Sequence, residues 1–180
     1  MNSYTEFLSG KKMVIRPVGK TIDKNSINPM LFDFQKDVVS WAVHKGRAAI
    51  FLDTGMGKTF IQLEWARLIN KKTLIIAPLS VARQTVREAK KIDIEVKYIR
   101  HSANMDTDHQ IFITNYEMVD DIDINQFKAV VLDESSILKA LDSKTRRRLT
   151  ELCKSIPYRL ACTATPAPND NIEIGNHAEF

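Results

Sequence analysis

A glycine-rich segment that ends in a lysine and a threonine carries the strongest chemical signal in the sequence. It reads Asp53-Thr54-Gly55-Met56-Gly57-Lys58-Thr59 and lies between an apolar run and a helical pattern. Glycines at this spacing let the backbone turn tightly and bring N–H groups onto phosphate oxygens, and a helix N-terminus adds positive dipole. We expect Lys58 to reach the β- and γ-phosphates of a nucleotide and the Thr59 hydroxyl to ligate Mg²⁺.

The full form of this motif has a further glycine five residues before Gly57, where this chain has Leu52. The other interpretation is a glycine-rich turn with an exposed lysine. The order of strand, loop and helix is what phosphate binding requires, so we favour a phosphate loop over residues 53–59.

Two carboxylates, Asp133 and Glu134, follow a second apolar run, Ala129 to Leu132. Asp133 is expected to hold Mg²⁺, and Glu134 to orient or deprotonate an attacking water. In a parallel sheet the carboxyl ends of the strands lie at one edge, where ligands bind. An Asp-Glu pair alone is usually a solvated turn, but the phosphate loop upstream favours the catalytic interpretation of this acidic pair.

A short hydroxyl-rich segment, Thr163-Ala164-Thr165-Pro166, follows a third apolar run. Small hydroxyl side chains at a strand end can connect the acidic pair to a neighbouring surface through hydrogen bonds. By itself this segment would be interpreted as a turn.

The elements that must position these residues alternate between apolar runs and helical patterns. We expect strands over 48–52, 73–77, 96–99, 111–114, 129–132 and 158–162, with a further short one near 13–16. We expect helices over 33–45, 59–69, 81–91 and 143–156, the first capped by Asp33. The strands are continuously apolar, which indicates an α/β fold with a mainly parallel sheet covered on both faces.

The composition is that of one globular domain: 180 residues, of which 44% are hydrophobic and 27% charged. No apolar run approaches the roughly 20 residues needed to span a bilayer, and the first residues lack the apolar core of a signal peptide. We therefore expect a cytoplasmic protein, in a phage- or bacterium-type host cell, with no membrane partner. The two cysteines cannot form a disulfide framework, and they have no zinc-site spacing.

The net charge of +4 favours polyanionic partners. Two helical patterns carry basic stripes, which are Arg83, Arg87, Lys90 and Lys91 on one and Lys144, Arg147 and Arg148 on the other. Such stripes can neutralise backbone phosphates, but they can equally be solvated surface.

Taken in order, these motifs resemble those of superfamily 2 helicases and translocases, most closely the Swi/Snf-like branch and its phage-encoded relatives. The resemblance runs from about Leu31 to Phe180 and implies a three-layer, RecA-like P-loop domain. Residues 31–180 would be the first RecA-like lobe, and residues 1–30 an N-terminal extension of unknown role. The second lobe, which binds ATP and nucleic acid against the first in this family, would be a partner within a longer chain.

The resemblance also implies roles for particular residues. The base-recognition segment, residues 32–35, would contact adenine through Phe34 and Gln35. The nucleotide phosphates would be bound by Thr54, Gly55, Met56, Gly57, Lys58 and Thr59. Nucleic-acid contacts would come from Pro78, Ser80, Arg83, Asn115 and Tyr116. Coupling between the acidic pair and the rest of the motor would involve Ser136, Lys139, Thr163 and Thr165. Ser136 stands where relatives carry a histidine.

The function implied is hydrolysis of Mg·ATP coupled to movement along nucleic acid, with double-stranded DNA favoured. Hydrolysis by this lobe alone should be weak, because the family's arginine finger lies in the second lobe and such a finger is worth roughly 10³ to 10⁵ in rate in other phosphoryl-transfer enzymes. A non-catalytic, ATP-responsive binding module is the alternative. A small kinase or G protein is disfavoured, because Asn70-Lys71-Lys72-Thr73 lacks the final aspartate of a guanine-recognition motif.

Overall fold

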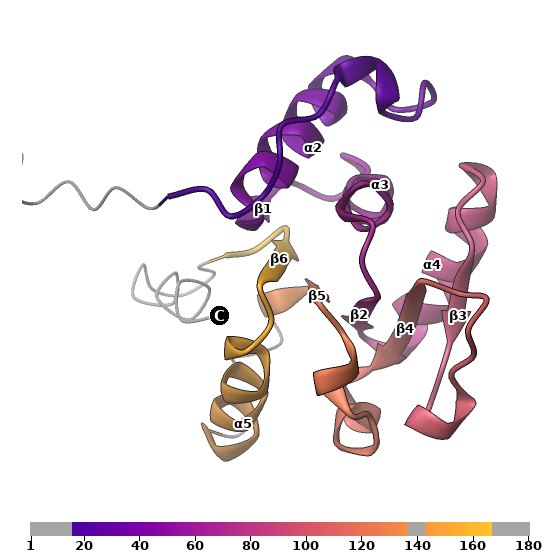
Figure 1. The fold of residues 1–180 in the computed structure, drawn as a ribbon, viewed down its shortest axis with the longest axis vertical. Helices are drawn as coiled ribbons and strands as arrows, with labels where there is room; N and C mark the ends of the chain where they lie inside the picture. Colours follow the sequence, from indigo (N-terminus) through magenta and orange to yellow (C-terminus); the bar gives the residue numbers. More distant parts are fainter. Residues whose placement is uncertain (1–15, 137–142, 167–180) are drawn as a thin grey trace, which may run out of the picture.

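The computed structural model describes residues 16–136 and 143–166, in which helices and strands alternate (Figure 1). The strands are β1 (Arg47–Phe51), β2 (Thr73–Ala77), β3 (Val96–Tyr98), β4 (Ile111–Asn115), β5 (Ala129–Asp133) and β6 (Tyr158–Thr163). The helices are α2 (Asp33–Lys45), α3 (Lys58–Ile69), α4 (Leu79–Lys91) and α5 (Ser143–Lys154). Short 3-10 turns are η1 (Lys24–Ser26), η2 (Ser102–Asn104), η3 (Tyr116–Asp121) and η4 (Ile124–Gln126).

The six strands form one sheet in the order β1-β6-β5-β2-β4-β3, and every neighbouring pair is parallel. β6 lies between β1 and β5, since Cys162 is in register with Ile50 on one side and with Asp133 on the other. This order brings the end of β1, before the phosphate loop, close to the end of β5. The prediction of an α/β fold with a mainly parallel sheet is confirmed.

Each face of the sheet is covered by a separate apolar core, because successive side chains of a strand point to opposite faces. One core packs the strand residues Ile75, Ile113, Val131 and Leu160 against α2, α3 and α4. The other packs Leu74, Phe112, Val130 and Ala161 against α5 and the turns after β4. Figure 1 shows the same three layers, with α2 and α3 on one side of the sheet and α5 on the other. This is a RecA-like arrangement, as expected.

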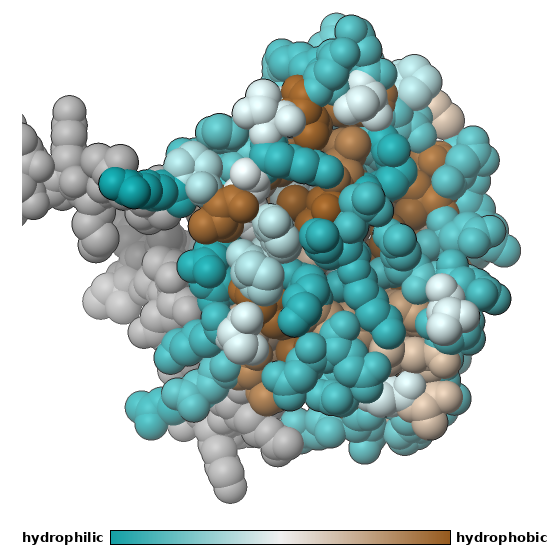
Figure 2. All heavy atoms as spheres, viewed as in Figure 1, coloured by the Kyte–Doolittle hydropathy of each residue, from teal (hydrophilic) through white to brown (hydrophobic). Residues whose placement is uncertain are grey.

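The outer surface differs in character from these cores. Figure 2 shows hydrophilic side chains over most of the visible face, with apolar side chains in small groups between them. The apolar side chains of the strands are thus largely buried against the elements that cover the two faces of the sheet.

The start of α2 differs from the prediction by one residue. Phe32, and not Asp33, is the N-cap, and the Phe32 N–H donates to Oε1 of Gln35 at 2.9 Å. An amide at the third helical position reaches back to the capping residue in this way in a capping box. The strand expected near 13–16 lies outside the described residues except for Arg16, which is in no strand.

The segment before α2 is attached to the rest of the chain, and the expected boundary of the lobe at residue 31 stays a prediction. The N–H groups of Val18 and Lys20 donate to Lys45 O and Val43 O at 3.1 and 3.2 Å, and Ile27 is buried in the core beneath α2 and α3. An apolar side chain at position 27 was present in the sequence, but the short segment has no periodicity from which its burial could be predicted.

Gly46 provides a test of this packing. Its backbone is left-handed (φ +71°), and a Cβ there would lie 2.7 Å from Gly19 N. We predict that Gly46→Ala lowers the thermal midpoint by several degrees, because left-handed backbone costs a non-glycine residue about 1–2 kcal/mol and each kcal/mol corresponds to about 2–4 °C in a chain of this length.

The matched control is Gly55→Ala, where the backbone is also left-handed (φ +84°) but a Cβ would meet nothing within 4 Å. Calorimetric melting should show a smaller loss for Gly55→Ala than for Gly46→Ala. Equal losses would mean that residues 18 and 19 do not pack against Gly46.

Candidate nucleotide site

The phosphate loop lies between β1 and α3 and presents backbone N–H groups at the start of that helix. Gly55 and Gly57 have φ of +84° and +77°, conformations that glycine adopts at no steric cost. The N–H groups of Phe60 and Ile61 donate to Gly57 O, so the hydrogen bonds of α3 begin there. The N–H groups of Lys58 and Thr59 precede the intrahelical ladder and are free to bind an anion.

The ammonium group of Lys58 is held over this loop by main-chain carbonyls. It donates to Leu52 O at 2.8 Å and to Asp53 O at 3.0 Å. An ammonium has three donors, so these bonds fix the charge beside the loop and leave one donor for a ligand.

A hydrogen bond joins α3 directly to the acidic pair. Nε2 of Gln62 donates to Oδ2 of Asp133 at 2.9 Å, and the Glu134 N–H donates to Oδ1 of Asp133 at 3.0 Å. Gln62 is one helical turn after Lys58, so both side chains lie on the same face of α3. The sequence analysis did not identify Gln62, although its position four residues after Lys58 was the available signal.

Asp133 is 6% exposed. This burial raises the pKa of its carboxyl above the ordinary value, while the Gln62 and Glu134 hydrogen bonds and the charge of Lys58 act in the opposite direction. Because Gln62 lies one turn after Lys58 on the same face of α3 and bonds to Asp133, Lys58 and Asp133 lie at the same edge of the sheet. A cation bound there would relieve the cost of the buried carboxylate.

Glu134 has an unusual backbone and a side chain fixed by hydroxyl groups. Its φ is +53°, a left-handed conformation that costs a non-glycine residue about 1–2 kcal/mol. Oε1 of Glu134 accepts from Oγ1 of Thr163 at 2.8 Å and from Oγ of Ser136. Thr163 Oγ1 in turn accepts from the Thr165 N–H at 3.0 Å. Two of the hydroxyls predicted for coupling, those of Thr163 and Ser136, thus contact Glu134, and their coupling role stays a prediction.

Two of the residues expected to contact nucleic acid are buried where β4 ends, and one of them, Tyr116, bonds to the acidic pair. Asn115 and Tyr116 are 3% and 8% exposed. The Tyr116 hydroxyl donates to Asp133 O at 2.9 Å, and burial raises the pKa of Tyr116 well above its usual range. Asn115 is bonded to the hydroxyl of Tyr98 and to the carboxylate of Glu117. In this structure both side chains are thus engaged within the domain, and their expected contact with nucleic acid stays a prediction.

The remaining expected contacts differ in how far the structure describes them. Ser80 and Arg83 are exposed in the first turns of α4, which starts after Pro78 at the carboxyl end of β2. Leu79 beside them is 47% exposed. Lys139 lies outside the described residues, so its expected coupling role stays a prediction.

Gln35 and Phe34 lie next to the phosphate loop. Nε2 of Gln35 donates to Met56 O at 3.1 Å, and a Cβ on Gly57 would lie 2.3 Å from the same nitrogen. Phe34 is 39% exposed, and its ring is stacked on that of Phe32, with centroids 6.3 Å apart. The base-recognition segment thus offers an exposed aromatic surface fixed to the loop.

The residues present fit a magnesium nucleotide. Lys58 and the open loop suit phosphate oxygens, Thr59 in the first turn of α3 offers a hydroxyl, and the buried Asp133 offers a hard oxygen ligand. An all-parallel sheet with a phosphate loop after β1 and an acidic pair after β5 defines a RecA-like P-loop domain of the kind found in superfamily 2 helicases.

The sequence matches the family described as type III restriction enzyme, res subunit, over residues 11–168, and the chain belongs to this family. Among curated proteins, no sequence matches it. Within the described residues, no helix has the length and apolar character needed to cross a membrane.

Solved structures share the fold. The UvsW helicase from bacteriophage T4 has a TM-score of 0.67 and 18% identity, covering 99% of this chain and 66% of that one. A second T4 UvsW structure has a TM-score of 0.67 and 21% identity, over 97% and 36% of the two chains. The Sulfolobus solfataricus SWI2/SNF2 ATPase core, solved in complex with dsDNA, has a TM-score of 0.68 and 21% identity, over 88% and 37%. The chain therefore spans between about one third and two thirds of these proteins.

The buried Asp133 leads to a prediction about stability. Because its pKa is raised in the folded state, the folded chain binds this proton more tightly than the unfolded chain. Stability is lost as pH rises from the ordinary aspartate range through the raised value. We predict that Asp133→Asn increases the thermal midpoint at pH 7 by roughly 2–4 °C, the shift that ~1 kcal/mol produces at this size.

This advantage of Asp133→Asn should shrink as the pH falls toward the ordinary aspartate range, because the raised pKa lets the wild-type carboxyl take up its proton. The measurement is a melting series over pH without nucleotide or divalent cation. If the thermal midpoint of Asp133→Asn relative to wild type were lower at pH 7 than at pH 4, the raised pKa of Asp133 would be contradicted.

Proposed function

We propose that this chain is the ATP-binding and ATP-hydrolysing lobe of a nucleic-acid-dependent helicase or double-stranded DNA translocase. The observation that carries the proposal is the bond from Gln62 to Asp133, which joins α3, one turn after Lys58, to the carboxyl edge of the sheet. Family membership and the shared fold with helicases support it.

In this proposal the loop from Thr54 to Thr59 binds the phosphates of ATP, and Phe34 and Gln35 bind the adenine. Thr59 and Asp133 would hold Mg²⁺, which supplies charge neutralisation at the β- and γ-phosphates when bound. Lys58 contributes a second positive charge to the same oxygens. The open loop at Gly55, where a side chain would have met nothing, supports room for a phosphate.

Glu134 would accept a proton from the attacking water or orient that water. Two hydroxyl donors on one oxygen hold its carboxylate in place, and a general base must be oriented toward the proton that it accepts. Because Thr163 is the last residue of β6 and bonds to Glu134, a movement at this end of the strand would shift Glu134. That contact is a physical route by which nucleic acid or a second lobe could control hydrolysis.

The nucleic-acid partner is proposed from the exposed start of α4 and from a similar structure that contains DNA. Arg83 and Ser80 are exposed at the start of α4, at the carboxyl edge of the sheet where the phosphate loop also lies. The Sulfolobus structure contains dsDNA, which favours a duplex as the track. The second RecA-like lobe is proposed because the chain spans only part of the helicases that it resembles.

The first test separates binding from hydrolysis. We predict that Lys58→Ala weakens Mg·ATP binding roughly ten- to a hundredfold, since a hydrogen bond from a charged group is worth about 1.5–3 kcal/mol. Glu134→Gln should keep the affinity and lower ATP turnover about 10²- to 10⁴-fold. Calorimetric titration and phosphate release measure the two quantities.

The matched control is Lys71→Ala, because Lys71 lies beyond the other end of α3. This variant should change neither the ATP affinity nor the turnover. Wild-type turnover by this chain should lie well below the roughly 10 per second of ordinary enzymes and should rise with DNA in a salt-dependent way. ATP binding with no turnover, with or without DNA, would instead favour the non-catalytic module.

The second test concerns Thr163. We predict that Thr163→Ala lowers ATP turnover with little change in ATP affinity, because Glu134 loses a donor from its carboxylate. Thr163→Ser keeps the hydroxyl and should restore most of the rate. If Thr163→Ser were as slow as Thr163→Ala, the methyl group and not the hydrogen bond would be responsible.

A further inference from the structure

A buried carboxylate on α3 has no part in the phosphate chemistry described above. Glu64 is fully buried, with a side-chain exposure of 0%. Three donors satisfy it: the main-chain N–H of Asn28 at 2.8 Å, and Nε and Nη2 of Arg67 at 2.8 and 2.6 Å. A charge so deep in a domain persists only when it is paired and hydrogen-bonded.

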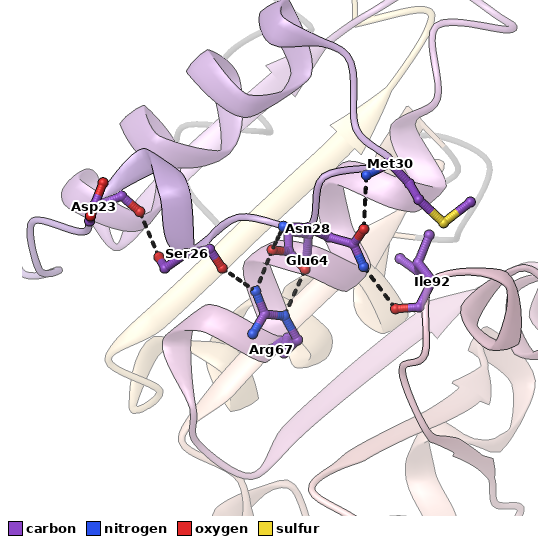
Figure 3. A network of polar contacts seen from close by, with 7 residues as sticks. All are labelled: Asp23, Ser26, Asn28, Met30, Glu64, Arg67 and Ile92. Atoms are coloured by element: carbon purple, nitrogen blue, oxygen red, sulfur yellow. Dashed lines mark hydrogen bonds and ion pairs between the residues drawn. The ribbon is translucent and has the colours of Figure 1, made fainter.

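The pair of Glu64 and Arg67 binds the backbone of the segment that precedes α2. While Glu64 accepts from the N–H of Asn28, Nη2 of Arg67 donates to Ser26 O at 2.7 Å (Figure 3). One side chain supplies the acceptor and the other the donor, as a neighbouring β-strand would. Two polar main-chain groups of this segment are thereby fixed to α3, which an apolar pair could not do.

Asn28 connects this segment to α4 as well. Its Nδ2 donates to Ile92 O at 2.9 Å, and its Oδ1 accepts from the Met30 N–H at 3.0 Å. Figure 3 shows Asn28 between the Glu64–Arg67 pair and the end of α4. Leu31, next along the chain, is 3% exposed. The chain thus enters the base-recognition segment from a point fixed on two helices.

The base-recognition segment is fixed at its other end to the phosphate loop. The Phe32 N–H donates to Gln35, and Gln35 donates to Met56 O. α3 therefore sets the position of this segment twice: directly through Glu64 and Arg67, and through the phosphate loop at its own N-terminus. Because a buried ion pair is weak evidence for stability, a role in fixing geometry is the better account of its presence.

We infer that Glu64 and Arg67 are positioning residues for recognition of the nucleotide base, acting through Asn28 on residues 32–35. The inference rests on the proposed function, since it requires ATP to bind at the phosphate loop. In this inference, Glu64 and Arg67 affect only the part of the ATP affinity that comes from the base. The part that comes from the phosphates depends on the phosphate loop.

The test compares Mg·ATP, Mg·GTP and Mg·tripolyphosphate, which has no base, by calorimetric titration of the chain. In Arg67→Met, the preference for ATP over tripolyphosphate should fall roughly tenfold, as expected when one or two hydrogen bonds that order a contact are lost. The preference for ATP over GTP should fall too, while tripolyphosphate affinity stays unchanged.

Lys154→Met is the matched control, because Lys154 forms an i,i+3 pair with Glu151 on α5, at the other face of the sheet. It should leave both preferences unchanged. If Arg67→Met does not fold, Asn28→Ala replaces it, since this variant keeps the main-chain N–H for Glu64 and removes only the bonds to Ile92 and Met30. It should show the same selective loss.

Three results would overturn the inference. Arg67→Met or Asn28→Ala could retain the wild-type preference for ATP, or could weaken ATP and tripolyphosphate equally, as a purely structural role would. Wild type could bind ATP no better than tripolyphosphate. This result would show that the phosphates are bound but that the base is not recognised. Failure of wild type to bind any of the three compounds would remove the proposed function itself, and is thus distinguishable from the others.

Discussion

The hydrogen bond from Gln62 to Asp133 is the interaction on which the rest of the site depends. It joins the helix that begins at the phosphate loop to the strand that ends in the acidic pair. β1 and β5 are not neighbours, because β6 lies between them, so the sheet alone does not fix the distance between Lys58 and Asp133. A direct bond across that gap holds a cation and a carboxylate at opposite sides of one small volume.

The arrangement of the acidic pair costs free energy, and this cost indicates a functional site. Asp133 lies in surroundings that disfavour its charge, and Glu134 has a left-handed backbone. Strained or desolvated groups persist where the surrounding structure fixes them, and they gather at functional sites. Here Gln62, Tyr116 and Thr163 provide the fixing bonds, each from a different element of the sheet or its helices.

Much of the fold could be predicted from the sequence, because apolar runs such as 73–77 and 129–132 leave little freedom in where strands lie. The phosphate loop and the acidic pair could also be predicted, since their chemistry depends on residue type and spacing. Gln62 and Glu64 could not, because a polar residue within a helix usually indicates a solvent-facing position, and only the packed sheet shows that these two side chains are buried.

The orientations of Asn115 and Tyr116 could not be predicted for the same reason. Asn115 and Tyr116 are polar residues at the end of a strand, and such residues can either face a ligand or support the neighbouring strand. The side chain of Tyr116 turns inward to Asp133 O, and nothing in the local sequence distinguishes these two orientations. The attachment of Ser26 and Asn28 to α3 likewise could not be predicted, because the side chains that bind their backbone groups are distant in sequence.

The most direct test of the account is a double-mutant cycle on Mg·ATP affinity with Lys58→Ala, Asp133→Asn and the double variant. If both side chains act on one magnesium triphosphate, the effects should be non-additive, with a coupling of about 0.5–3 kcal/mol as found for groups that share partners. Additive losses, or no loss from Asp133→Asn in the presence of Mg²⁺, would contradict the claim that α3 and β5 together form a single nucleotide site.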